Sequence, residues 1–229
     1  MSTSLIFAAT PTAWSDTVSS KDRHRTGLLP ESLVSRLASS YADLPRDPHM
    51  RSGDDYRYRA FAQGSVINGR IEWESEATFE QAADINAYAG GQKRSFAPIR
   101  SDVLRDVVEV VDHLREDVIG VESDALIGAH QIRVIAGDGV TGLPAPEGVH
   151  QDGFDIVATC VIGLTNVSGG VTTLTTDAAG QHVVAQESLG AREYAAFDDR
   201  ALFHYVSPVN ALVPGQTHRD VLVLTFTLI

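Results

Sequence analysis

The residues best suited to chemistry lie in the second half of the chain, around the segment PEGVHQDG. His150 and Asp152 stand two residues apart at the start of an apolar run, and in a strand such residues point to the same face. A second histidine, His204, follows in ALFHYVSPV. Two imidazoles and one carboxylate on one side of a metal make a facial triad, which leaves coordination positions open for other ligands. These three residues are therefore candidate metal ligands.

The surroundings of the triplet favour a metal site over a chance occurrence. A bare H-x-D is a weak signal, because a capping Asp beside a solvated His gives the same letters. Here a loop rich in Pro and Gly, GDGVTGLPAPEG, precedes the triplet, and a β-branched run follows it. Arg219, in HRDVLVLTF, could hold a dicarboxylate through two parallel hydrogen bonds. Such a triad is typical of non-haem Fe(II) oxygenases.

Composition and charge narrow the class of protein. The chain has 229 residues, a formal net charge of −12 and one cysteine, Cys160, which lies inside an apolar run. The negative charge argues against nucleic acid and against an anionic membrane surface, since both attract clustered Lys and Arg. No apolar run is long enough to span a bilayer, and a single cysteine excludes an intramolecular disulfide. We therefore expect a cytoplasmic protein with no nucleic-acid or membrane partner.

The hydrophobic pattern changes along the chain. Apolar residues recur at helical spacing in 30–43, in 76–89 and most clearly in 101–119, where Gly120 follows the end. From residue 128 the period becomes that of strands separated by turn signals such as NVSGG and DAAG. Strands do not alternate with helices there, which disfavours a parallel sheet. The sequence predicts an α+β fold: a double-stranded β-helix (jelly roll, cupin-like) core, with helices contributed mainly by the N-terminal half.

Several of these segments together resemble one family. HQIRV, PEGVHQDG, the Gly-Gly turn of NVSGGVTTL, FDDRALFHYVSP and HRDVLVLTF are similar to bacterial Fe(II)- and 2-oxoglutarate-dependent dioxygenases that hydroxylate free L-amino acids. The isoleucine 4-hydroxylase group is the best-known example, and INAYAGGQKRSFAPI also resembles it. The resemblance covers roughly residues 50–229 and is most specific in the second half. In residues 1–45 we recognise no resemblance to a family.

The resemblance implies an iron centre and its cosubstrate. It implies His150, Asp152 and His204 as ligands of Fe(II), with 2-oxoglutarate and O₂ completing the coordination. It implies Arg219 as the anchor for the distal carboxylate of 2-oxoglutarate. Many such enzymes carry Ser or Thr two positions after that arginine, whereas this chain has Val221. A second hydrogen bond to the carboxylate must therefore come from elsewhere.

A free amino acid presents an ammonium and a carboxylate, and both need partners when they are buried. Arg94 is the preferred carboxylate clamp, because it follows a Gly-Gly turn that lets the backbone approach closely. Arg57 and Arg59 share one face of the strand-like YRYRAF and are alternatives. Asp155 could pair with the ammonium. Each of these residues could instead be a solvated or locally hydrogen-bonded side chain.

Two polar residues in HQIRV raise a further question. Gln131 and Arg133 share one face of the predicted strand, and large polar residues in a core strand need partners. That face would be the ligand side, with Gln131 binding the cosubstrate, or it would meet solvent. His130 would then face the core and is not counted as a ligand.

These observations predict a single dioxygenase domain over residues 1–229, with an unassigned extension at 1–45 and a β-core at 128–229 that carries the metal site. The expected activity is hydroxylation of a free L-amino acid coupled to decarboxylation of 2-oxoglutarate to succinate and CO₂. The alternatives are a cupin-like binding protein without turnover, and a dioxygenase that acts on a carrier- or protein-bound amino acid. Aliphatic substrates such as isoleucine and polar ones such as citrulline both fit the sequence, and oligomeric state stays open.

Overall fold

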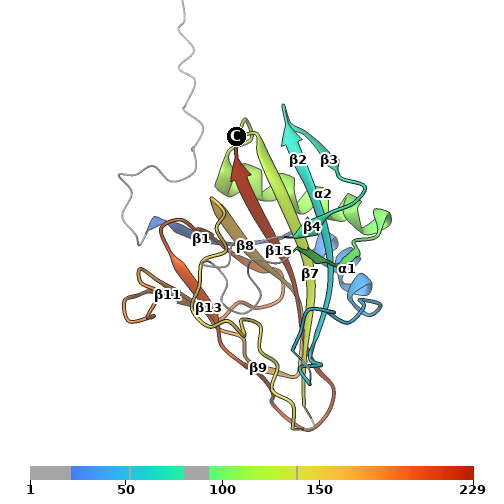
Figure 1. Ribbon diagram of the computed structural model, residues 1–229, viewed down its shortest axis with the longest axis vertical. Helices are drawn as coiled ribbons and strands as arrows, with labels where there is room; N and C mark the ends of the chain where they lie inside the picture. Colours follow the sequence, from blue (N-terminus) through green and yellow to red (C-terminus); the bar gives the residue numbers. More distant parts are fainter. Residues whose placement is uncertain (1–21, 52, 80–92, 138) are drawn as a thin grey trace, which may run out of the picture.

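The computed structural model describes residues 22–51, 53–79, 93–137 and 139–229. These residues are mostly β-sheet with two α-helices (Figure 1). The helical elements are α1 (Glu31–Ala38), the 3-10 turn η2 (Ser39–Tyr41), α2 (Ser101–Leu114) and the π-helical turn η3 (Arg115–Ile119). The strands are β1 (His24–Leu28), β2 (Arg57–Ile67), β3 (Arg70–Trp73), β4 (Thr78–Phe79), β5 (Arg94–Ser95), β6 (Ala97–Pro98), β7 (Ala125–Ala136), β8 (Ile156–Thr165), β9 (Val167–Gly169), β10 (Thr172–Thr175), β11 (Val183–Glu187), β12 (Glu193–Asp198), β13 (Phe203–Val206), β14 (Val209–Ala211) and β15 (Thr217–Leu228).

One large sheet forms the centre of the molecule. Its strand order is β1-β12-β8-β15-β7-β2-β3, and β6 adds to β2 as a parallel neighbour. The other pairs are antiparallel, and β15 pairs with β7 along its whole length and with β8 on its other side. The N-terminal half thus supplies β1, β2 and β3 to the same sheet as the strands after residue 128. Residues 24–28 of the unassigned extension pair with β12.

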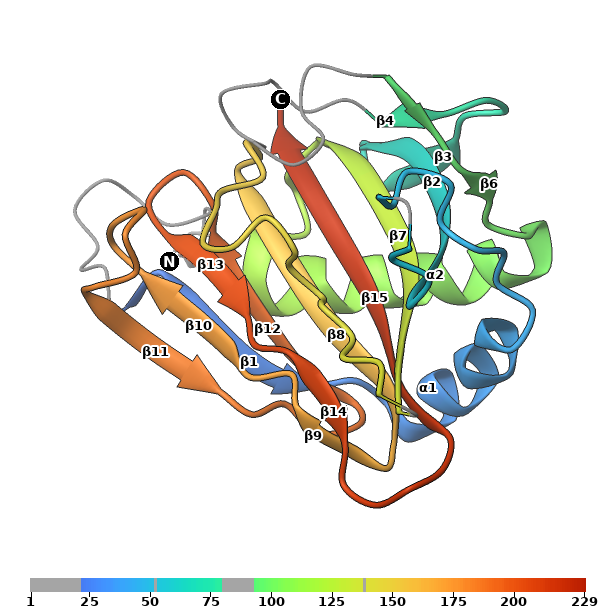
Figure 2. The same ribbon diagram turned by 60° about the horizontal axis from the view of Figure 1, so that its bottom comes forward.

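Strands β11-β10-β13 form a second, smaller sheet, and β9 pairs with β14. In Figure 2 this layer lies in front of the large sheet, and α1 and α2 lie behind it. Leu174 of β10 packs against Val157 of β8 and Phe197 of β12, which joins the two sheets. The site described below lies between these layers.

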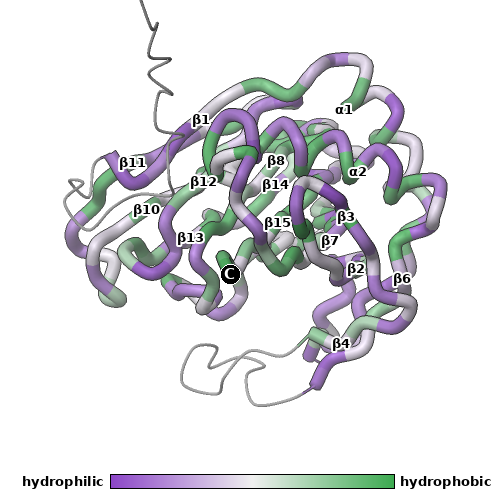
Figure 3. Tube along the Cα trace, turned by 90° about the horizontal axis from the view of Figure 1, so that it is seen from above, coloured by the Kyte–Doolittle hydropathy of each residue, from purple (hydrophilic) through white to green (hydrophobic). Residues whose placement is uncertain are grey.

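The helices cover the other face of the large sheet. Val107, Val111 and Leu114 of α2 pack against apolar residues of the sheet such as Ala158 and Leu224. Hydrophobic segments accordingly gather where α2 lies against β8, β15 and β7 in Figure 3. Successive side chains of a strand point to opposite faces of its sheet. Every second residue of β2, β7, β8 and β15 therefore points toward the helices, and the others point toward the face that carries the smaller sheet. Neither α1 nor α2, nor any other helix in the described residues, has the length and apolar character needed to cross a bilayer.

The predicted helices have different outcomes. The helix expected at 30–43 is present as α1 and η2, and the one at 101–119 as α2 and η3, which end at Gly120 with φ 103°. The helix expected at 76–89 is wrong at its start, because Thr78–Phe79 is the strand β4, paired with β5. Residues 80–89 of that prediction lie outside the described residues.

Candidate active site

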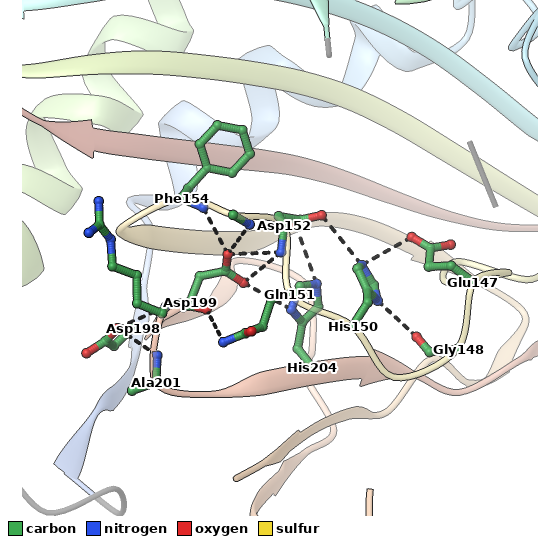
Figure 4. A network of polar contacts seen from close by, with 12 residues as sticks. Glu147, Gly148, His150, Gln151, Asp152, Phe154, Asp198, Asp199, Ala201 and His204 are labelled. Carbon is green, nitrogen blue, oxygen red and sulfur yellow. Dashed lines mark hydrogen bonds and ion pairs between the residues drawn. The ribbon is translucent and has the colours of Figure 1, made fainter. Parts of the chain in front are cut away.

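The two histidines lie side by side on antiparallel segments. His150 is in the loop before β8 and His204 is on β13. The amide of His150 donates to the carbonyl oxygen of His204 (3.0 Å), and the amide of His204 donates to the carbonyl oxygen of His150 (2.8 Å). Their ring centroids are 4.1 Å apart. This pairing fastens the loop to the smaller sheet and holds both imidazoles on one side (Figure 4).

Asp152 completes the group. Its Oδ1 lies 3.5 Å from Nε2 of His150, and its Oδ2 lies 3.5 Å from Nε2 of His204. The ligand atoms of the three residues all lie within 4.8 Å of one another. The structure therefore brings together the three residues that the sequence pattern singled out. Two imidazole nitrogens and one carboxylate fit Fe(II).

A hydrogen bond fixes the orientation of His150. Its Nδ1 lies 2.9 Å from the carbonyl oxygen of Gly148, so Nδ1 carries the proton and donates it. Nε2 is then the nitrogen left to bind a metal in place of its proton, in the manner of metal-bound histidines whose other nitrogen donates to an acceptor. Burial lowers the pKa of His150, but the carboxylates of Asp152 and Glu147 raise it more, to about 9. The charges around Nε2 thus favour a cation.

Asp199 holds the turn that carries Asp152. Its fully buried carboxylate accepts hydrogen bonds from the amides of Asp152 (2.9 Å), Gly153 (2.7 Å) and Phe154 (3.0 Å). The Oδ1 atom of Asp199 also lies 3.5 Å from Nδ1 of His204. One carboxylate therefore positions two of the three candidate ligands, as Figure 4 shows.

Arg219 lies on β15 with its side chain turned to the face that carries the metal residues. It is only 2% exposed, makes no ion pair among the described residues, and its Nη2 has no hydrogen-bond partner there. Burial lowers the pKa of Arg219 to about 10, which still leaves it protonated at neutral pH. A Cβ on Gly170 would lie 3.0 Å from Cδ of Arg219, so the glycine leaves room for the arginine side chain. A buried, unpaired guanidinium is suited to a carboxylate ligand.

One cavity connects these residues. It has a volume of about 110 Å³, and His150, Asp152, His204 and Arg219 all line it. Apolar side chains such as Val221 cover part of the wall, and Val221 offers no hydrogen bond to a ligand of Arg219. The remaining charged residues in the wall are Arg57, Arg59, Arg94 and Glu147.

Comparison with known families agrees with this geometry. A model of the 2OG-Fe dioxygenase family, in which 2OG stands for 2-oxoglutarate, matches residues 38–225. The chain belongs to this family. It is therefore an oxidoreductase that uses Fe(II), 2-oxoglutarate and O₂, and the triad is consistent with iron binding. This membership decides against the alternative of a binding protein without turnover.

Solved structures share the fold of this 2OG-Fe dioxygenase. A bsmA homologue from Methylobium petroleophilum PM1 is 29% identical, with a TM-score of 0.70 over 87% of this chain and 82% of that chain. IDO from Bacillus thuringiensis is 19% identical, with a TM-score of 0.69 over 90% and 91% of the two chains. The Fe(II)/α-ketoglutarate-dependent dioxygenase TqaL is 14% identical, with a TM-score of 0.62 over 90% and 82%. A search of the curated proteins gives no significant match.

The arginines of β2 and β5 reach the cavity of the dioxygenase from the side of β2. Arg57 donates from Nε to Oδ2 of Asp47 (2.8 Å), so its charge is already balanced. Arg94 is 3% exposed, and its guanidinium carbon lies 4.9 Å from the ring centroid of Phe79. Burial and the nearby Arg57 lower the pKa of Arg94. The three predicted carboxylate clamps, Arg57, Arg59 and Arg94, therefore all lie in the cavity wall and are not surface arginines.

Asp155 does not lie where the sequence placed it. Its Oδ2 accepts a hydrogen bond from the amide of Leu228 (2.9 Å), and its Oδ1 pairs with Arg200. Asp155 is not in the cavity wall. The structure therefore does not bring Asp155 to the metal residues, and this carboxylate instead holds the end of β15.

Gln131 points away from the cavity. It lies on the helix-facing side of β7, where its Nε2 donates to Oγ of Ser40 (2.7 Å), and Arg133 on the same side pairs with Asp220. The cavity is lined instead by His130, Ile132 and other residues of the opposite face. A role for Gln131 in cosubstrate binding is therefore not supported. Both faces of β7 are covered by protein. Gln131 and Arg133 therefore bond to Ser40 and to Asp220 of β15, and not to a ligand.

Sequence reasoning missed three contributors to the site. Glu147 lies in the cavity wall, with Oε1 3.1 Å from Nε2 of His150. His130 accepts a hydrogen bond at Nδ1 from Nη2 of Arg59 (2.7 Å). Asp199 supports Asp152 and His204 from the turn before β13. The available signal was proximity in sequence: Glu147 lies three residues before His150, and Asp199 lies five before His204.

Proposed function

We propose that this 2OG-Fe dioxygenase hydroxylates a free L-amino acid. The observation that carries the proposal is a cavity that brings several buried arginines together with the metal residues. Arg219 belongs to β15, and Arg57, Arg59 and Arg94 belong to β2 and β5. Arg219 can bind the distal carboxylate of 2-oxoglutarate, which leaves the other arginines for the carboxylate of a small substrate.

The residues have distinct tasks in this reaction. His150, Asp152 and His204 hold the iron, which with 2-oxoglutarate and O₂ supplies the oxidation of a C–H bond and releases succinate and CO₂. Arg219 fixes the distal end of 2-oxoglutarate. The arginines of β2 and β5 hold the substrate so that one C–H bond points to the metal.

The apolar part of the wall supports the same chemistry. Val157, Val221 and Val223 line the cavity and exclude water from the reacting centre. They carry no group that would itself be easily oxidised.

The finer identity rests on the sequence resemblance. The segments around His150, His204 and Arg219 are similar to the isoleucine 4-hydroxylase group, so an aliphatic amino acid is the first substrate to test. We also propose that the two sheets are the two halves of a double-stranded β-helix within a single domain over residues 1–229. A cytoplasmic location stays a prediction from composition.

A substrate screen tests the proposal. The purified protein is incubated with Fe(II), ascorbate, 2-oxoglutarate and each of the twenty amino acids, citrulline and ornithine. Mass spectrometry reads the gain of one oxygen, and succinate is measured in the same samples. We expect one or a few related amino acids to gain oxygen and to stimulate succinate release. Succinate release that no free amino acid stimulates would count against the proposal and favour a carrier- or protein-bound substrate.

A further inference from the structure

Arg59 carries a buried charge that forms no ion pair with a carboxylate of the described residues. Its side chain belongs to β2, is 7% exposed and lines the cavity. Among the described residues its Nη2 donates to the neutral acceptor Nδ1 of His130, and its Nε has no partner. Arg57, two residues before it, differs in having Asp47 at 2.8 Å. Arg59 is therefore a cation in this wall that forms no ion pair among the described residues.

The site is built to keep that cation in place. The guanidinium carbon of Arg59 lies 4.3 Å from the ring centroid of Phe96 and 5.3 Å from that of Phe79. Aromatic faces stabilise a cation without neutralising it. A buried, unpaired charge is costly, so it is retained where a ligand of opposite sign completes it. Arg219 has the same property in the same cavity.

Two buried arginines without an ion pair match two ligand carboxylates. In this family one of them is the distal carboxylate of 2-oxoglutarate, for which Arg219 is available. Arg59 then remains for a carboxylate of the substrate. Lining the same cavity, Arg94 adds positive charge beside it.

Glu147 supplies the opposite charge in the same cavity. Its only ion pair among the described residues is with His150, where Oε1 lies 3.1 Å from Nε2. That nitrogen is the one that faces Asp152 and binds a metal, so the contact with Glu147 is lost when iron is present. Glu147 is not part of the group whose ligand atoms converge within 4.8 Å. With iron bound, its carboxylate becomes free to accept a hydrogen bond from a cationic ligand.

We propose that Arg59 and Glu147 together form a receptor for the zwitterionic head of an α-amino acid, Arg59 for the carboxylate and Glu147 for the ammonium. This inference rests on the proposed function and deepens it. The receptor places the head group by charge and leaves the side chain to be selected by the apolar wall. It replaces Asp155, which faces elsewhere, as the partner of the ammonium.

Calorimetry with charge-deleted ligands tests the receptor. The protein is loaded with Fe(II) and 2-oxoglutarate without oxygen and titrated with L-isoleucine, with 2-hydroxy-3-methylpentanoate, which lacks the ammonium, and with L-isoleucinamide, which lacks the carboxylate. L-Leucine, L-arginine and L-citrulline are run in parallel. In the wild type each deletion should weaken binding about ten- to a hundredfold, because each removes a charge-assisted contact.

The variants separate the two charges. Glu147→Gln should lose most of the discrimination against the hydroxy acid and keep that against the amide, and Arg59→Gln should do the reverse. Glu122→Gln and Arg105→Gln, both exposed, serve as matched controls and should keep both ratios. Arg59→Lys, which retains the charge, should keep part of the discrimination if Arg59→Gln does not fold.

The outcomes distinguish this inference from the proposed function. If none of the four amino acids binds to the wild type, the proposed function fails and the receptor with it. If they bind and both variants keep the wild-type ratios, only the receptor is overturned. A Glu147→Gln protein that no longer retains iron, measured as bound metal per chain, would instead assign Glu147 to the metal and overturn its role toward the ammonium.

Discussion

Arg59 donates a hydrogen bond from Nη2 to Nδ1 of His130 over 2.7 Å, and this bond fixes the tautomer of the histidine. Because Nδ1 is the acceptor, the neutral imidazole carries its proton on Nε2. The ring is stacked on Phe61, with centroids 4.4 Å apart, and is 2% exposed. The histidine is thus held in one orientation and one protonation state in the cavity wall.

His130 should make the fold sensitive to acid. Burial lowers the pKa of His130 well below its usual value, and the positive charge of Arg59 lowers it further. In the unfolded chain the pKa returns to about 6.5. The unfolded state therefore binds more protons as the pH falls below that value, so stability is full above about pH 6.5 and is lost toward lower pH.

Substitution of His130 isolates this contribution. The free energy of unfolding in urea is measured between pH 8 and pH 5 for the wild type and for His130→Asn. Below pH 6.5 the free energy of unfolding of the wild type should fall more steeply than that of His130→Asn, by up to about 1.4 kcal/mol per pH unit. Asn keeps an acceptor for Arg59 but does not titrate. Parallel stability curves for the two proteins would show that His130 is not held neutral.

Asp199 should control the affinity for iron without binding it. In Asp199→Asn one acceptor oxygen is replaced by a donor that faces the amides of Asp152, Gly153 and Phe154. The turn should loosen, and the affinity for Fe(II), measured by anaerobic titration, should fall about ten- to a hundredfold.

Asp198→Asn is the matched control for this variant. Asp198 accepts hydrogen bonds from the amides of Arg200 and Ala201 and pairs with Arg23, but it does not touch the turn of Asp152. This variant should lose stability and keep its iron affinity. Equal iron affinities in both variants would remove the special role of Asp199.

The sequence predicts the parts of the site that depend on residues close together in the chain. The strand β15 was predictable because its alternation is local, and His150 and Asp152 were predictable because neighbours two apart share a face. Alternation does not say which face of a strand meets the cavity. Gln131 was expected to face a ligand or solvent, whereas it faces the helices, because its partner Ser40 is 91 residues away in the chain.

Other parts depended on contacts that no local pattern reveals. The strand β4 forms because Thr78 and Phe79 pair with Ser95 and Arg94, so helical spacing of apolar residues was a poor guide there. Asp47, ten residues before Arg57, forms an ion pair with Arg57. This ion pair distinguishes Arg57 from Arg59. Only the folded chain shows which arginine lacks an anion.

Arg219 should determine the requirement for 2-oxoglutarate. Arg219→Ala removes a charge-assisted contact worth roughly 1.5–3 kcal/mol, so the apparent KM for 2-oxoglutarate should rise about ten- to a hundredfold, with little change in the KM for the amino acid. Arg219→Lys should recover only part, because an ammonium cannot make two parallel bonds to a carboxylate. Arg105→Ala, on the exposed side of α2, is the control. An unchanged dependence on 2-oxoglutarate in Arg219→Ala would end this assignment.

Arg94 should couple the two halves of the reaction. Its guanidinium is buried in the cavity wall and lies 4.9 Å from the ring centroid of Phe79. Arg94 is not one of the three metal residues, so Arg94→Ala should still bind iron and 2-oxoglutarate and should still release succinate. The hydroxylated product per succinate should fall, because the substrate C–H bond is no longer held at the metal. Measuring both products in one reaction, beside Arg105→Ala, tests this. A wild-type ratio together with an unchanged KM for the amino acid would show that Arg94 does not position the substrate, and would leave that task to Arg59.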